Sequence, residues 1–168
     1  MKTGFLAGAA IAMSLLALPA QAAPEWATIL MEKVVDRTPD QTWAKIGPYC
    51  AIQTWLKVPC VVTAGNQVSV GTNRRLNGKT DEIIVAMTPY SYTYAQPVSD
   101  VQPESPIFYH GTLAVEPLDR GRKTKIVYTL FYDQAPLNTT EAKIANREAR
   151  TKRFNEALDA MKALAESP

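Results

Sequence analysis

Residues 138–166 read NTTEAKIANREARTKRFNEALDAMKALAE, and this stretch decides the fold because it is the only long segment with a clear helical period and a defined start. Asn138 can cap the helix, and Glu141 can complete a capping box with it. Small or apolar side chains then recur every three or four residues, which predicts one buried stripe composed of Ile144, Thr151, Phe154, Leu158, Met161 and Ala165. The segments before the helix are mostly strand-like, so we expect a curved antiparallel sheet wrapped around it.

The first strand-like segment, 27–37, is followed by two short helices. Thr38 can cap the first of these together with Gln41, and Gly47 begins the Gly-Pro pair that ends it. The second short helix is expected over 49–55. The sequence therefore predicts that two short helices separate the first strand from the rest of the sheet.

From Cys60 onward the pattern is typical of an antiparallel meander. Further strands are expected over 61–63, 68–76, 80–87, 90–95, 107–116 and 123–133. Asn77-Gly78 is a strong hairpin signal, and with these two as the turn residues Arg74 falls opposite Asp81. If that ion pair is exposed, we expect it to contribute well under about 1 kcal/mol.

Large side chains with polar tips alternate with smaller residues along the later strands. This alternation places the large side chains on one face of the sheet. They are Tyr90, Tyr92, Tyr94, Tyr109, Leu113, Tyr128, Leu130 and Tyr132. His110 falls between Tyr109 and Gly111, so it is predicted to lie on the opposite face as a solvated histidine.

The order of strand, two short helices, about six antiparallel strands and long helix resembles the START-like, or SRPBCC, superfamily. That superfamily includes birch-pollen-allergen relatives, polyketide cyclases and lipid-transfer domains. The resemblance covers 23–168 as a single domain and is carried by 38–43, 49–55, 70–75, 94–97 and 124–128. It implies an α+β helix-grip fold, in which a curved antiparallel sheet of six to seven strands surrounds the C-terminal helix.

The resemblance also implies a cavity between the concave face of the sheet and the long helix, used for apolar or amphipathic small molecules. The candidate ligand-binding residues are Trp55, Tyr92, Tyr94, Tyr109, Leu113, Tyr128, Leu130, Arg147, Phe154 and Leu158. The alternative is that the tyrosines fill a closed core with their hydroxyls at its edge. Trp55 is likewise either a gate at the cavity mouth or a plug in the core.

Arg147 lies where the helical stripe, followed back from Phe154 through Thr151, calls for a buried residue. A buried guanidinium needs an acceptor or a route to solvent along its stem. The acceptor is either the anionic headgroup of a ligand or a carboxylate of the protein.

The predicted helix over 138–166 carries a cluster of basic residues, which consists of Lys143, Arg147, Arg150, Lys152 and Arg153. Such a cluster is typical of a solvated helix face. The functional alternative is docking to an acidic partner or to a membrane surface.

Cys50 and Cys60 are the two cysteines of the chain, and an even pair in an exported protein predicts a disulfide. A metal site is the weaker interpretation because His110 is the only histidine and no CxxC or HxxxH spacing exists. A buried pair of free thiols is the remaining alternative.

The N-terminus has the pattern of a secretory signal peptide over 1–22. Lys2 provides the positive start, 5–18 is an apolar run too short to span a membrane, and Ala20-Gln21-Ala22 is a cleavage site. We therefore expect a periplasmic or secreted protein that begins at Ala23 and has no stable membrane span. A formal net charge of +2 argues against a dedicated nucleic-acid binder.

No catalytic pattern stands out. The lone histidine forms no triad, and neither Glu82 nor Glu116 has a carboxylate partner at a useful spacing. We assign no catalytic residue, metal or cofactor and expect a carrier of a hydrophobic or amphipathic small molecule or lipid. The resemblance leaves two alternatives open: a cyclase or dehydratase-like enzyme, and an accessory protein that partners a periplasmic redox enzyme such as the methanol oxidation system.

Overall fold

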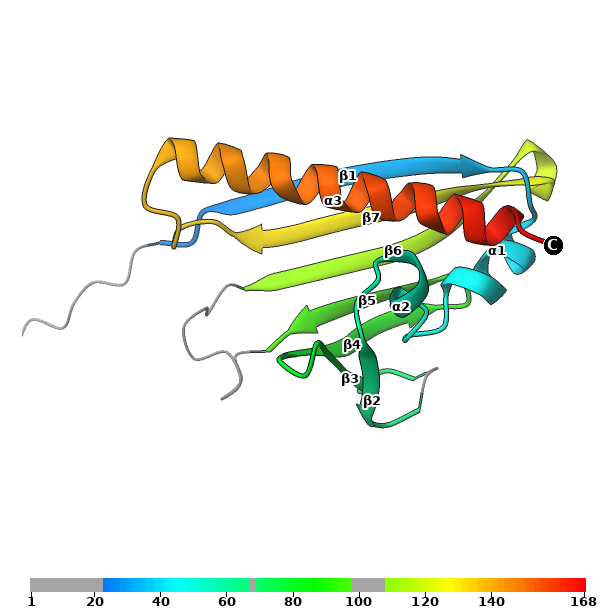
Figure 1. Cartoon of the computed structure of the whole chain (residues 1–168), viewed down its shortest axis with the longest axis horizontal. Coiled ribbons are helices and arrows are strands. Elements are labelled where there is room, and N and C mark those ends of the chain that lie inside the picture. Colours follow the sequence, from blue (N-terminus) through cyan, green and yellow to red (C-terminus); the bar gives the residue numbers. More distant parts are fainter. Residues whose placement is uncertain (1–22, 67–68, 98–107) are drawn as a thin grey trace, which may run out of the picture.

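The computed structural model describes residues 23–66, 69–97 and 108–168, and within them the chain forms one seven-stranded antiparallel sheet with the order β1-β7-β6-β5-β4-β3-β2. The long helix α3 (Thr140–Glu166) lies along β1 (Trp26–Val35) and β7 (Lys123–Asp133) and covers the inner face of the sheet (Figure 1). This arrangement confirms the predicted α+β helix-grip fold.

The other elements follow the predicted order. They are α1 (Pro39–Ile46), α2 (Ile52–Trp55), β2 (Cys60–Ala64), β3 (Asn73–Leu76), β4 (Thr80–Thr88), β5 (Ser91–Gln96), β6 (Tyr109–Leu118) and the short 3-10 helix η1 (Asp119–Gly121). Buried and partly exposed residues alternate along β5, β6 and β7, as expected for strands with one face on the core. The buried side chains of these strands therefore form the inner face of the sheet, which α3 and the two short helices cover.

The connection between β1 and β2 holds the two short helices against the end of the sheet. Thr38 caps α1, because its hydroxyl accepts from the amide of Gln41 (3.3 Å) and the Gln41 side chain accepts from the amide of Thr38 (3.1 Å). The predicted disulfide joins Cys50, just before α2, to Cys60 at the start of β2. Residues 50–60 are therefore a closed covalent loop.

The start of the long helix differs from the prediction by one residue. Thr139 is the cap, since its hydroxyl accepts from the amide of Ala142 (3.1 Å), so the box that was predicted from Asn138 and Glu141 is wrong.

The buried stripe of the long helix also begins later than predicted. None of the side chains of residues 140–153, all of which the structure describes, is buried. Ile144, which was predicted to be part of the stripe, is 53% exposed. The gripped part of α3 starts at Phe154.

The β3–β4 hairpin has the predicted turn but another register. Asn77 and Gly78 both have positive φ, yet Leu76 pairs with Thr80 because Lys79 is an additional residue in the loop. Each cross-strand pair is therefore shifted by one residue, which makes the predicted Arg74–Asp81 pair wrong. The partners are Arg74 with Glu82, and Arg75 with Asp81.

Some predictions fall outside the described residues. They include the signal peptide over 1–22, the start of the predicted strand at Val68 and Ile107 at the start of another. Within the part that is described, the strand predicted over 68–76 begins only at Asn73, because 69–72 form a turn. No helix of the described residues has the length and apolar character needed to cross a membrane.

We predict that Phe154→Ala and Leu158→Ala each lower the free energy of unfolding by about 2 to 5 kcal/mol, because both side chains are buried between α3 and the sheet. Lys152→Ala, at an exposed position of the same helix, should change it by less than about 0.5 kcal/mol. Urea unfolding of the three variants measures both effects. Equal losses at Phe154 and Lys152 would contradict the assignment of the gripped face.

Candidate functional site

Two hollows lie on the inner face of the sheet, next to β4 and β5. Ile84 and Tyr92 line the first, while Glu82 and Tyr94 line the second. In each strand the two residues are two positions apart, which corresponds to about 7 Å along the strand. The hollows are therefore neighbours that share the same two strands.

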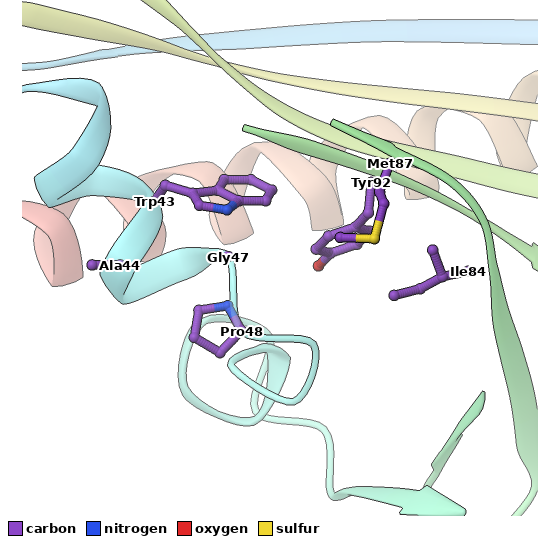
Figure 2. A pocket seen from close by; sticks show the side chains of 7 residues that line it. All are labelled: Trp43, Ala44, Gly47, Pro48, Ile84, Met87 and Tyr92. Carbon is purple, nitrogen blue, oxygen red and sulfur yellow. The ribbon is translucent and has the colours of Figure 1, made fainter. Parts of the chain in front are cut away.

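The first hollow is apolar and has a volume of about 370 Å³. It is lined by Trp43, Ala44, Gly47, Pro48, Ile84, Met87 and Tyr92. Figure 2 shows Trp43 and Pro48 on one side, with Met87, Tyr92 and Ile84 facing them across the opening. A Cβ atom on Gly47 would lie 2.6 Å from the Trp43 ring, so glycine allows the indole to lie against the backbone here.

The second hollow is smaller, about 170 Å³, and lies between the sheet and the middle of α3. Its polar lining includes Glu82, Gln96, Arg150 and Arg153. The remaining lining residues are Ile52, Leu56, Val58, Leu76, Asn77, Thr80, Tyr94, Tyr109 and Phe154. The second hollow lies where a cavity was predicted between the sheet and the helix, and core side chains fill the rest of that space.

A buried ion pair between Arg74 and Glu82 lies beside the second hollow. Nε and Nη2 of Arg74 both donate to Oε2 of Glu82 (2.8 and 2.6 Å), and Gln96 donates to Oε1 (3.0 Å). Burial opposes the charged form of Arg74, but the Glu82 carboxylate together with the surrounding tyrosines outweighs it and keeps the pKa of Arg74 above its ordinary value. The two charges therefore neutralise each other inside the protein.

Aromatic rings enclose the Arg74 guanidinium. Its central carbon lies 4.1 Å from the ring centroid of Tyr49 and 5.2 Å from that of Tyr94, and the guanidinium also donates to the backbone carbonyl of Tyr49. The electron-rich ring faces compensate in part for the lost water. These contacts fix Arg74 in one position beside Glu82, which lines the second hollow.

The tyrosine hydroxyls of the inner face are neutral donors and acceptors. Tyr94 and Tyr128 share a hydrogen bond (2.9 Å), and burial raises the pKa of both hydroxyls. Burial also raises the pKa of Tyr109 to about 12. Because a Cβ atom on Gly111 would overlap the Tyr94 hydroxyl, glycine is required at that position. None of these three hydroxyls is ionised near neutral pH.

Most of the predicted ligand-binding residues are buried, but they have different roles. Tyr94, Tyr109 and Phe154 line the second hollow, and Tyr92 lines the first. The others fill the core and line neither of these two hollows: Trp55, Leu113, Tyr128, Leu130 and Leu158. Trp55 packs edge-on against Tyr128 (6.2 Å between ring centroids), which places it in the core. The inner face is thus a packed aromatic core that leaves two hollows, and ligand binding by these residues stays a prediction.

Arg147 is apart from the other predicted site residues. Its side chain is exposed and lines a separate shallow hollow with Glu25, Lys143 and Ile144 at the start of α3. The prediction that it occupies a buried position is wrong, because the helix packs tightly on the sheet only from Phe154 onward.

His110 lies on the outer face of the sheet, as predicted. It is only partly exposed, however, because Phe108 and Phe131 lie beside its ring (5.6 and 6.4 Å between centroids). Its Nδ1 is buried and has no hydrogen-bond partner among the described residues. The expected solvated histidine is therefore half-buried in a small aromatic cluster.

Sequence reasoning missed the charged residues of the inner face. Residues two apart on a strand share a face, so Arg74 points inward with Leu76. Glu82 points inward with Ile84 for the same reason. Alternation alone carried this signal. It was overlooked because a charged residue is seldom assigned to a buried face.

Comparison with known proteins identifies the family. The model of the family described as "Polyketide cyclase / dehydrase and lipid transport" matches residues 27–166. The chain belongs to this family. The match confirms the resemblance to the SRPBCC superfamily, and no curated protein matches the chain in sequence.

Solved structures of the same fold are distant in sequence. A protein from Nitrosospira multiformis is 22% identical with a TM-score of 0.65, and the alignment covers 84% of this chain and 97% of that one. Truncated norcoclaurine synthase from Thalictrum flavum is 17% identical with a TM-score of 0.63, covering 88% and 98%. Ara h 8.0201 is 14% identical with a TM-score of 0.57, covering 83% and 99%. These likenesses establish the fold.

We predict that Arg74→Met lowers the free energy of unfolding by about 3 to 5 kcal/mol, because it leaves the Glu82 carboxylate buried and unpaired. Combining Arg74→Met with Glu82→Leu should recover most of that loss. Arg75→Met is the matched control, since Arg75 pairs with Asp81 at a partly exposed site and should cost no more than about 1 kcal/mol. If the double variant were as unstable as the single one in urea unfolding, the charge pairing would not be the cause.

Proposed function

We propose that the protein is an exported carrier that binds a hydrophobic or amphipathic small molecule in the two adjoining hollows. The observation that carries the proposal is the apolar hollow of about 370 Å³ between Trp43 and Ile84. Its volume falls in the range of about 300 to 1,000 Å³ that is usual for small-molecule sites. Met87 on its wall is a flexible side chain that adapts to ligands of different shape.

The polar groups near the hollows favour binding over catalysis. Among the residues that line the two hollows, Glu82 is the one with a carboxylate. This carboxylate accepts hydrogen bonds from Arg74 and Gln96, so it is not free to act as a general acid or base. The hydroxyls of Tyr94 and Tyr109 have raised pKa values and stay protonated. A carrier needs only shape and hydrogen bonds from these groups, whereas a cyclase or dehydratase needs a group that moves protons.

Two observations support export. The first is the charged, apolar and small-residue pattern over 1–22, which is typical of a signal peptide. The second is the Cys50–Cys60 disulfide, because such bonds persist in oxidising compartments such as the periplasm. An exported carrier would meet its ligand, or a protein partner, outside the cytoplasm.

Ala44→Trp should block the apolar hollow. Ala44 is an exposed residue of α1 at the rim of the hollow, so a large side chain there covers the opening without disturbing the core. We expect it to weaken binding of the neutral fluorescent probe N-phenyl-1-naphthylamine at least roughly tenfold, the effect of about 1.4 kcal/mol.

The matched control is Ala149→Trp, at an exposed alanine of α3 that lines neither hollow. It should bind the probe as the parent protein does, and both variants should keep the parent's melting temperature. Equal probe affinity of Ala44→Trp and the parent protein would place binding elsewhere.

Export is tested by expressing the full chain in a Gram-negative host. The periplasmic fraction should contain a protein that begins at Ala23 and has no free thiol by labelling after denaturation without reductant. Intact mass spectrometry gives both results. Recovery of the uncleaved chain in the cytoplasm with two reactive thiols would contradict export, and it would leave the proposed binding to be judged by the probe.

A further inference from the structure

We infer that the second hollow selects ligands that carry a carboxylate, which Arg150 and Arg153 bind at the mouth between α3 and the sheet. The inference rests on the proposed function, because it names the chemical class of the ligand for the same pair of hollows. An apolar body would occupy the first hollow, and the carboxylate would lie in the second.

Arg150 is held in place by aromatic rings. Its guanidinium carbon lies 4.6 Å from the ring centroid of Tyr132 and 5.1 Å from that of Tyr109. Its Nε donates to the side chain of Asn146, one helical turn earlier (2.8 Å). Within the described residues its two terminal nitrogens have no hydrogen-bond or ion-pair partner. A planar guanidinium fixed in this way is ready to donate two parallel bonds to a carboxylate.

Arg153 adds a second charge to the same lining. In the part of the chain that the structure describes, neither arginine has a carboxylate partner. Elsewhere on α3, Lys143 pairs with Glu25 and Lys162 pairs with Glu166, whereas Arg147 and Lys152 likewise have no carboxylate partner among the described residues. The mouth of the second hollow therefore carries two positive charges that no carboxylate of the described residues neutralises.

Glu82 also lines the hollow, and its carboxylate is paired with Arg74, which offsets part of its negative charge. Burial and the Glu82 carboxylate raise the pKa of Tyr109, while Arg150 and Arg153 oppose that rise, so the charges of both signs in the lining act on the Tyr109 hydroxyl. An anion that entered would meet two guanidinium groups and a neutral hydroxyl.

The arrangement also explains why Arg147 does not take this role. It lies one turn before Arg150, in the exposed hollow that contains Glu25 and Lys143. Lys143 and Arg147 therefore line the exposed hollow at the start of α3, whereas Arg150 and Arg153 line the second hollow on the inner face.

The test compares dodecanoate, dodecanol and dodecyl phosphate as competitors that displace N-phenyl-1-naphthylamine from the whole mature protein. Arg150→Gln should weaken displacement by dodecanoate roughly tenfold or more, as expected for the loss of hydrogen bonds to a charged group, and leave displacement by dodecanol unchanged. Arg153→Gln should have a smaller effect in the same direction. Arg147→Gln is the matched control and should resemble the parent protein with every competitor.

The outcomes separate this inference from the proposed function. If the probe and dodecanol bind but Arg150→Gln leaves dodecanoate unaffected, the carboxylate site is wrong and the carrier stands. Equal weakening of dodecanoate and dodecanol would also overturn the inference, because it would indicate a general packing role. Tighter binding of dodecyl phosphate than of dodecanoate would contradict the carboxylate class. Failure of the probe and of all three competitors to bind would overturn both proposals.

Discussion

Removing the Glu82 carboxylate from water is costly unless its charge and its lone pairs are satisfied, and much of the inner face is arranged around this requirement. Arg74 from β3 neutralises it, Gln96 from β5 donates to it, and Tyr49 from the segment between α1 and α2 stacks on Arg74. One pair of charges thus ties three strands to the helical connection. The two hollows lie next to this fixed group, which gives them a rigid base.

Periodicity predicted most of the fold because it depends on which residues are apolar. The bounds of β7 match the predicted 123–133, and its inward residues are buried as expected. Details that depend on single residues were less predictable. Thr139 and Asn138 are both suitable caps, and only the backbone conformation decides between them. One extra loop residue, Lys79, shifts the register of β3 against β4, and the Asn-Gly signal cannot reveal it.

The candidate site was harder to predict than the fold. The sequence indicated which side chains face inward, but not how tightly they pack, so core residues such as Leu130 and lining residues such as Tyr94 looked alike. Arg147 was chosen because it continues the stripe of Phe154, whereas the position along the helix at which contact with the sheet begins is a tertiary property. Arg150 was visible only as one member of a basic cluster, since its contacts with Tyr109 and Tyr132 depend on the final packing.

The covalent loop from Cys50 to Cys60 restricts the movement of one wall of the second hollow. Ile52, Leu56 and Val58 belong to this loop, and all three line the second hollow. Cross-linking limits how far that wall can move, because its ends are joined and its side chains are packed against the core. The opposite wall is formed by long side chains on an otherwise exposed stretch of helix. If a ligand binds as proposed, its exchange would depend on rotamer changes of the less constrained Arg153, on the timescale of side-chain motion, rather than on opening of the fold.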